Sequence, residues 1–113
     1  MIVKNERDVK AEKIIEEGAE NVTIQWLVDG KLGAPNFAMR RFVIGKDGHT
    51  PLHKHDWEHE VFVLSGRGTL INGNGKEMPL SEGNFAFVSP NEVHQFKNAG
   101  DADFVFLCII PIK

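Results

Sequence analysis

The stretch Gly48-His49-Thr50-Pro51-Leu52-His53-Lys54-His55-Asp56-Trp57-Glu58-His59-Glu60 holds four of the five histidines of this 113-residue chain. Imidazole is the commonest metal ligand in proteins, because its neutral form offers a nitrogen lone pair at physiological pH. Residues i and i+2 of an extended segment share one face, so His53 and His55 would point the same way. The stretch therefore predicts a metal site built on β-structure, against the alternative of an exposed, solvated cluster of histidines.

A helical interpretation of the same stretch is also possible. Residues 55–59 read H-x-x-E-H, the inverted zinc-peptidase motif, which places both histidines on one face only if the segment is a helix. Pro51 precedes the segment, and Val61-Phe62-Val63 follows it with strand propensity, so little room is left for a helix. We therefore favour the extended interpretation.

Short β-rich runs separated by turn residues surround this stretch. The alternation of apolar residues predicts strands at residues 22–28, 36–44, 60–64, 69–71, 84–88, 93–96 and 103–110. Asp29-Gly30 and the run Asn72-Gly73-Asn74-Gly75 are strong turn signals between strands. Only residues 9–17 have a pattern compatible with a helix, which Gly18 would end. The chain is therefore expected to be all-β and antiparallel between residues 20 and 111, as a sandwich or barrel.

Composition limits the classes of protein that this chain can represent. The hydrophobic content of 42% and charged content of 26% are typical of one globular domain, here residues 1–113. The net charge of −3 and the lack of a basic stripe argue against a nucleic-acid partner. No apolar run is long enough for a membrane span, and residues 1–13 lack the apolar region of a signal peptide. The single cysteine, Cys108, suits a reducing compartment, so we expect a cytoplasmic protein.

Two groups of residues carry a resemblance to the cupin superfamily, whose members are small β-barrels with a metal inside. In residues 47–66, His53 and His55 match the H-x-H of the first cupin motif, and Gly66 matches its closing glycine. In residues 83–98, Gly83, His94 and Asn98 match the second motif in register, while Asn91 stands where a glycine is expected and can adopt the same left-handed turn. The resemblance implies a single-domain antiparallel β-barrel, or jelly roll.

The chain departs from the cupin pattern at the position of the motif's glutamate. After three intervening residues from His55 comes His59, and after four, the motif's longer gap, comes Glu60. Neighbours on a strand face opposite sides of the sheet, so only one of the two can point inward. Six residues separate His59 from Gly66, as the motif requires, and five separate Glu60 from it. The spacing favours His59, and the chain resembles the four-histidine branch of small cupins, with His53, His55, His59 and His94 as ligands of one metal.

The resemblance implies one divalent transition metal per chain, with manganese or iron first and copper, nickel or zinc as alternatives. Four neutral ligands leave the ion its full charge, which makes it a strong Lewis acid without a carboxylate base beside it. We expect an oxygenase-type enzyme acting on a small organic substrate. The alternatives are a non-catalytic module that binds a small ligand or metal, and a metal-dependent isomerase or decarboxylase of small acids or sugars. The absence of tyrosine weighs against a sugar isomerase.

Residues on two further strands are candidates for the lining of the barrel. Phe104, Phe106 and Cys108 share one face of the last strand, and one of Arg40 and Arg41 must face inward because they are neighbours on a strand. An inward arginine, for which Arg40 is our candidate, could hold a carboxylate. Small cupins commonly pair, so we expect a homodimer, with residues 1–3 and 22–28 as candidate contact segments.

Overall fold

The structure is a computed structural model that describes all of residues 1–113. Apart from two short 3₁₀ turns, η1 (Glu6–Asp8) and η2 (Gly30–Leu32), every regular element is a strand. The strands are β1 (Glu12–Lys13), β2 (Glu20–Val28), β3 (Phe37–His49), β4 (His59–Ser65), β5 (Arg67–Asn72), β6 (Glu77–Ser81), β7 (Phe85–Val88), β8 (His94–Asn98) and β9 (Phe104–Pro111).

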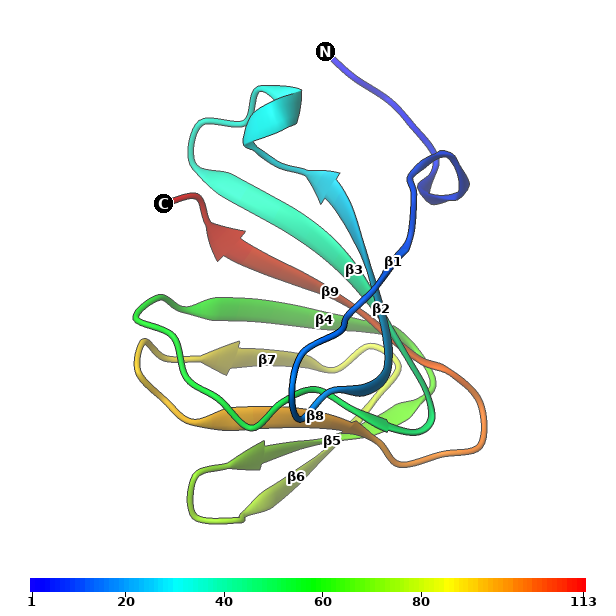
Figure 1. Cartoon of the computed structure of the whole chain (residues 1–113), viewed down its shortest axis with the longest axis vertical. Helices are drawn as coiled ribbons and strands as arrows, with labels where there is room; N and C mark the ends of the chain where they lie inside the picture. Colours follow the sequence, from blue (N-terminus) through cyan, green and yellow to red (C-terminus); the bar gives the residue numbers. More distant parts are fainter.

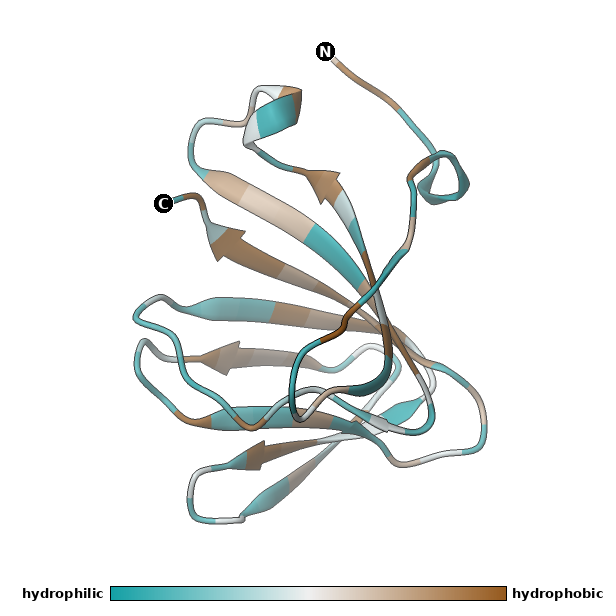
Figure 2. Ribbon diagram, viewed as in Figure 1, coloured by the Kyte–Doolittle hydropathy of each residue, from teal (hydrophilic) through white to brown (hydrophobic).

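All pairings are antiparallel, and one continuous sheet runs in the order β6-β5-β8-β3-β9-β4-β7, with β2 also pairing with β3 and β1 with β2. The sheet curls into a nearly closed barrel, which is the predicted all-β jelly-roll architecture (Figure 1). Hydrophobic residues are concentrated along strands such as β9, whereas the connecting loops are mostly hydrophilic (Figure 2). Some strands that pair in the sheet, such as β3 and β9, are far apart in the sequence. Their pairing brings distant parts of the chain together around one interior.

The core fills one end of this interior with aromatic rings. Phe106 on β9 is almost fully buried, and its ring centroid lies 4.8 Å from that of Phe96 and 5.1 Å from those of Phe42 and Phe104. Burying such rings removes a large apolar area from water, and this burial is the main source of folding free energy. Three of these rings, those of Phe42, Phe96 and Phe106, also line the cavity described below.

The N-terminal segment differs from its prediction. Residues 9–17 form no helix: β1 pairs with the edge of β2, with Glu12 opposite Ile24 and Lys13 opposite Thr23. The amide of Ile14 then donates to the carbonyl of Val22, and the Ile14 side chain packs against the core. Pairing satisfies backbone groups of the β2 edge that a helix would have left free. No helix of the structure is long and apolar enough to cross a bilayer.

Two positive-φ positions shape the ends of the strands that carry the histidines. Asn91 has φ 66°, so its predicted left-handed turn is confirmed, and its amide donates to the carbonyl of His55 at 2.6 Å. Gly66 has φ 81°, and a Cβ atom there would lie 2.2 Å from the carbonyl oxygen of Asp103. Gly66 is therefore required both by its backbone conformation and by the close approach of the segment before β9.

Candidate functional site

Backbone pairing brings the histidines of two distant segments together. His53 and His94 form an isolated antiparallel bridge, in which the amide of each donates to the carbonyl of the other at 3.1 Å and 2.9 Å. Residues paired in this way project their side chains to the same face of the sheet. His53 and His55 were expected on a strand, but the segment between β3 and β4 is a loop with this one bridge, pinned by Asn91. The loop nevertheless directs both rings to the same interior.

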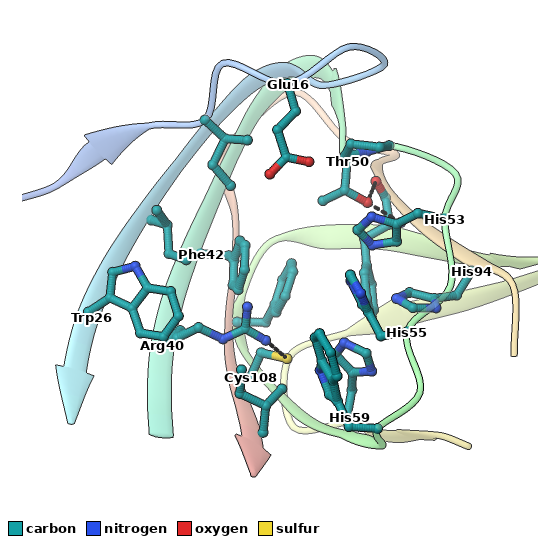
Figure 3. Close-up of a pocket in the computed structure, with 17 residues that line it drawn as sticks. Glu16, Trp26, Arg40, Phe42, Thr50, His53, His55, His59, His94 and Cys108 are labelled. Carbon is teal, nitrogen blue, oxygen red and sulfur yellow. Dashed lines mark hydrogen bonds between the residues drawn. The ribbon is translucent and has the colours of Figure 1, made fainter. Parts of the chain in front are cut away.

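The imidazoles of His53, His55, His59 and His94 form one cluster (Figure 3). The ring centroids that face one another lie between 4.4 Å and 6.1 Å apart. His59 begins β4 and is only 4% exposed, whereas Glu60 is exposed on the outer face of the sheet. Of the two residues that competed for the fourth position, the structure therefore places His59 beside the other three histidines.

The nitrogen atoms of the four rings form a candidate donor set for a metal ion. As they stand, no three His, Cys, Asp or Glu side chains are positioned to hold one ion together. However, Nδ1 of His59 is buried and has no hydrogen-bond partner, and such an atom is costly unless a further group satisfies it. Nδ1 of His94 lies 2.9 Å from the carbonyl of Glu92, the kind of bond that orients a ligating ring and leaves its other nitrogen free. The donor set therefore suits a metal.

Burial also prepares the rings chemically. It lowers the pKa of His53 to about 4 and that of His59 to about 3, with further lowering by the charge of His94. The pKa values of His55 and His94 are lowered as well, chiefly by burial. Arg40 adds positive charge that lowers all four pKa values. The imidazoles are consequently neutral at pH 7, which is the form that binds transition metals.

The cluster forms one wall of a cavity of about 320 Å³ whose other walls are largely aromatic and aliphatic. Arg40 lines this cavity, and its guanidinium donates to Sγ of Cys108 at 3.0 Å, so of the two neighbouring arginines it is Arg40 that faces inward. Arg41 instead pairs with Glu6, with Nε 2.6 Å from the carboxylate. Burial raises the pKa of the Cys108 thiol, which keeps it neutral.

Two of the predicted lining residues on β9 line the cavity and one does not. Phe106 and Cys108 border it, but Phe104 is absent from its wall and packs in the core, where Gly68 leaves room for its ring. The physical reason is position along the strand: Phe104 lies two residues, or about 7 Å, farther from the histidines than Phe106.

Several other residues that line the cavity were not among the predicted site residues. Ile14 and Glu16 come from the N-terminal segment, and Figure 3 shows the Glu16 carboxylate directed into the cavity. Trp26 on β2 and Thr50 after β3 complete this side. Trp57 also lines the cavity, and its ring stacks on that of His55 with centroids 4.4 Å apart. Strand alternation could have indicated Trp26, but nothing local in the sequence indicates Glu16.

The chain is a small antiparallel β-barrel with clustered histidines in its interior. It thus has the features of β-barrel proteins whose functional site lies inside the barrel. The family model described as a cupin domain matches residues 40–110, and the chain belongs to this cupin family. The match runs from Arg40 within β3 to Ile110 near the end of β9, so it includes all four clustered histidines.

Three similar proteins extend this finding. The polyketide cyclase RemF from Streptomyces resistomycificus has a solved structure that matches with a TM-score of 0.94 and 33% identity, covering 100% of this chain and 80% of that one. Auxin-binding protein 1 from Arabidopsis thaliana is 32% identical over 99% of this chain and 61% of its own length. The oxalate-binding protein from Thermotoga maritima is 38% identical over 52% of this chain and 49% of its own length. The chain thus spans about half to three-fifths of the length of these two curated relatives.

Proposed function

We propose that this chain is a metal-dependent enzyme that acts on the enolisable carbonyl group of a small, flat organic molecule. The observation that carries the proposal is the convergence of four neutral imidazoles on one wall of a cavity whose other walls are mainly apolar. His53, His55, His59 and His94 would hold one divalent transition metal after their rings turn about the side-chain bonds. When bound, this metal supplies Lewis-acid chemistry at a carbonyl oxygen.

The residues of the chain supply substrate binding and proton transfer. Trp26, Phe42 and Phe106 present ring surfaces against which a flat carbon skeleton can pack. Glu16 is the one carboxylate that lines the cavity, and it can accept a proton from the carbon next to the carbonyl. Removal of that proton is the first step of an intramolecular condensation, so the match with a polyketide cyclase over the whole chain supports this reaction class.

Oxygenase-type chemistry is the second candidate. Imidazole ligands suit the redox-active metals iron and copper as well as zinc, and manganese is a further candidate. With a redox-active metal, the same histidine cluster would serve an enzyme that consumes oxygen. The third candidate is a module that binds without catalysis, since two relatives are named as binding proteins, for oxalate and for auxin. Sugar isomerisation has less support, because Glu16 is the one carboxylate that lines the cavity and the chain has no tyrosine to serve as a second acid or base.

The test combines metal analysis with turnover. Protein purified without added metal is subjected to elemental analysis, and it is then incubated with aromatic β-diketones in an oxygen electrode with product analysis. The proposal predicts bound metal and turnover without oxygen uptake. Oxygen uptake coupled to turnover would support the oxygenase instead, and tight binding of these compounds without turnover would support the binding module. Glu16→Gln should lower kcat at least about tenfold, since general bases contribute roughly 100-fold or more.

A further inference from the structure

The buried polar atoms that lack a partner gather in one place. Four side-chain nitrogens are buried without a hydrogen bond: Nε of Arg40, Nε of Arg41, Nε1 of Trp57 and Nδ1 of His59. Arg41 Nε has the Glu6 carboxylate 2.6 Å away, so it is satisfied by an ion pair. The other three nitrogens all belong to residues that line the histidine cavity. Because proteins rarely leave buried polar atoms unpaired, these atoms indicate what a ligand of the cavity must offer.

The charge of Arg40 is also unbalanced. The two ion pairs of the chain join Arg41 to Glu6 and Lys46 to Asp101, so no carboxylate pairs with Arg40. Its one hydrogen bond goes to the Cys108 thiol, a weak acceptor without charge. A half-buried guanidinium normally has an anionic partner, because removing its charge from water is costly. The partner of Arg40 is therefore expected to come from outside the chain.

The guanidinium is held in place rather than free to swing out. Its Cζ atom lies 5.5 Å from the ring centroid of Trp26 and 5.0 Å from that of Phe42, within the range of cation–π contacts. Trp26, Arg40 and Cys108 are direct cross-strand neighbours on β2, β3 and β9, so they form one row on the inner face of the sheet. In Figure 3 the Arg40 side chain reaches across the cavity from β3 toward the histidines. The pairing of β2, β3 and β9 thus fixes the position of the Arg40 side chain.

Trp57 supplies a second donor from the histidine side. Its ring stacks on His55 with an interplanar angle of 9°, and its Nε1 is the buried nitrogen without a partner. An indole N–H can only donate, so it requires an acceptor atom. The cavity therefore combines a fixed cation, an unpaired N–H donor and aromatic walls.

We propose that the substrate of this site is an aromatic acid or a similarly flat molecule with a carboxylate, and that Arg40 is the residue that selects this anionic group. The inference rests on the proposed function for the identity of the site, and it adds the class of substrate. Arg40 binds the carboxylate through its guanidinium, Trp57 donates a further hydrogen bond to an acceptor of the same ligand, and the aromatic walls hold its ring. Arg40 is thus a specificity-determining residue.

The test compares a charged ligand with its neutral counterpart. Calorimetry on the full chain measures the Kd of naphthoate and of naphthamide, with the protein as purified and after its metal is removed with a chelator. Hydrogen bonds to charged groups are worth about 1.5–3 kcal/mol, so naphthoate should bind at least about tenfold more tightly than naphthamide. Arg40→Met should remove most of this preference in each metal state and leave naphthamide binding nearly unchanged. Arg67→Gln, which removes an exposed arginine on β5 outside the cavity, should keep the preference.

Several results separate this inference from the function proposed above. Unchanged naphthamide binding shows that the cavity of Arg40→Met is intact, and Arg40→Lys, which retains a cation, should keep part of the preference. An unaltered preference in Arg40→Met in both metal states overturns the inference, as does equal binding of the two ligands by the wild type. A carboxylate preference that depends on Arg40, without any turnover, supports the inference and contradicts the enzyme proposal.

Trp57→Phe keeps a ring on His55 and should weaken naphthoate binding several-fold by loss of the N–H.

Discussion

Replacement of His59 by alanine tests the identity of the metal site most directly. His59 is the residue at which the chain departs from the common cupin motif, and its ring lies 4.7 Å from that of His94 and 5.4 Å from that of His55. Glu60, one residue along β4, lies opposite Phe87 and Ile109 and is exposed on the outer face. The pair His59→Ala and Glu60→Ala therefore compares two neighbouring positions that lie on opposite faces of one strand.

The size of the effect follows from the position of the ring. Groups that merely hydrogen-bond to a ligand change metal affinity by about 10–100-fold, so loss of a direct ligand should weaken binding at least about tenfold. This corresponds to at least about 1.4 kcal/mol of binding free energy. Glu60→Ala should leave the affinity nearly unchanged, because its carboxylate cannot reach the cluster from the opposite face. His59→Glu should retain metal, since it creates the three-histidine, one-glutamate set of the common motif.

The assay is calorimetric titration of each metal-free variant with zinc and with manganese, after circular dichroism has shown that the variant is folded. His59→Glu serves as the control for loss of a buried side chain, since it fills the position that alanine empties. The reasoning is refuted if Glu60→Ala loses the metal while His59→Ala keeps it. In that case the inward residue of β4 would be Glu60, and the register of this strand would be shifted by one residue.

Three further predictions concern stability and assembly. Gly66→Ala should lower the free energy of unfolding by more than about 2 kcal/mol, because the new Cβ would clash with the Asp103 carbonyl and the backbone φ is positive. Gly75→Ala should lower it by only about 1 kcal/mol, because φ is 78° but the space around this glycine is open. Urea denaturation of both variants compares the two values. The metal-free protein should lose stability as the pH falls from about 6.5 to about 4. The reason is that the folded-state pKa values of His53 and His59 lie below the unfolded value, so the unfolded chain binds more protons in this range. Denaturation midpoints measured at several pH values should show this dependence, and the dependence should be weaker in His59→Ala. The chain should be a homodimer in solution, and light scattering that gives the monomer mass of 12.7 kDa at micromolar concentration would contradict this.

The strands were predictable where they alternate and are bounded by turn residues. The runs that became β2, β4, β5, β7, β8 and β9 have this local pattern, and their ends shift by only a few residues in the structure. β3 was predicted to stop before Gly45 but continues to His49, because Glu20 of β2 and Lys97 of β8 pair with its far end. β6 was missed because Pro79 interrupts its strand propensity. Proline is tolerated there because β6 lies at an edge of the sheet.

The candidate site was predictable only in part, because only some of its residues belong to local sequence patterns. The spacing from His59 to Gly66 and the second motif around His94 are local features, and they indicated residues that the barrel does bring together. The choice between Arg40 and Arg41 depends on which face of β3 meets the interior, which the sequence left open. Glu16 reaches the cavity through the pairing of β1 with β2, a contact that no local pattern encodes.

The two arginines show how one strand divides structural and functional tasks between neighbouring residues. Arg41 faces away from the cavity, where it donates to the side chain of Gln25 at 3.0 Å and pairs with Glu6. The Gln25 amide in turn donates to the carbonyls of Glu6 and Val9, so this face of β3 and β2 fastens the N-terminal segment to the barrel. That segment continues to Glu16, which lines the cavity. Arg40, facing the other way, keeps its charge uncompensated beside four neutral imidazoles. Arg41, paired with Glu6 and Gln25, therefore helps to fix the segment that carries part of the cavity wall, while Arg40 presents to the cavity a cation that forms no ion pair with a carboxylate of the chain.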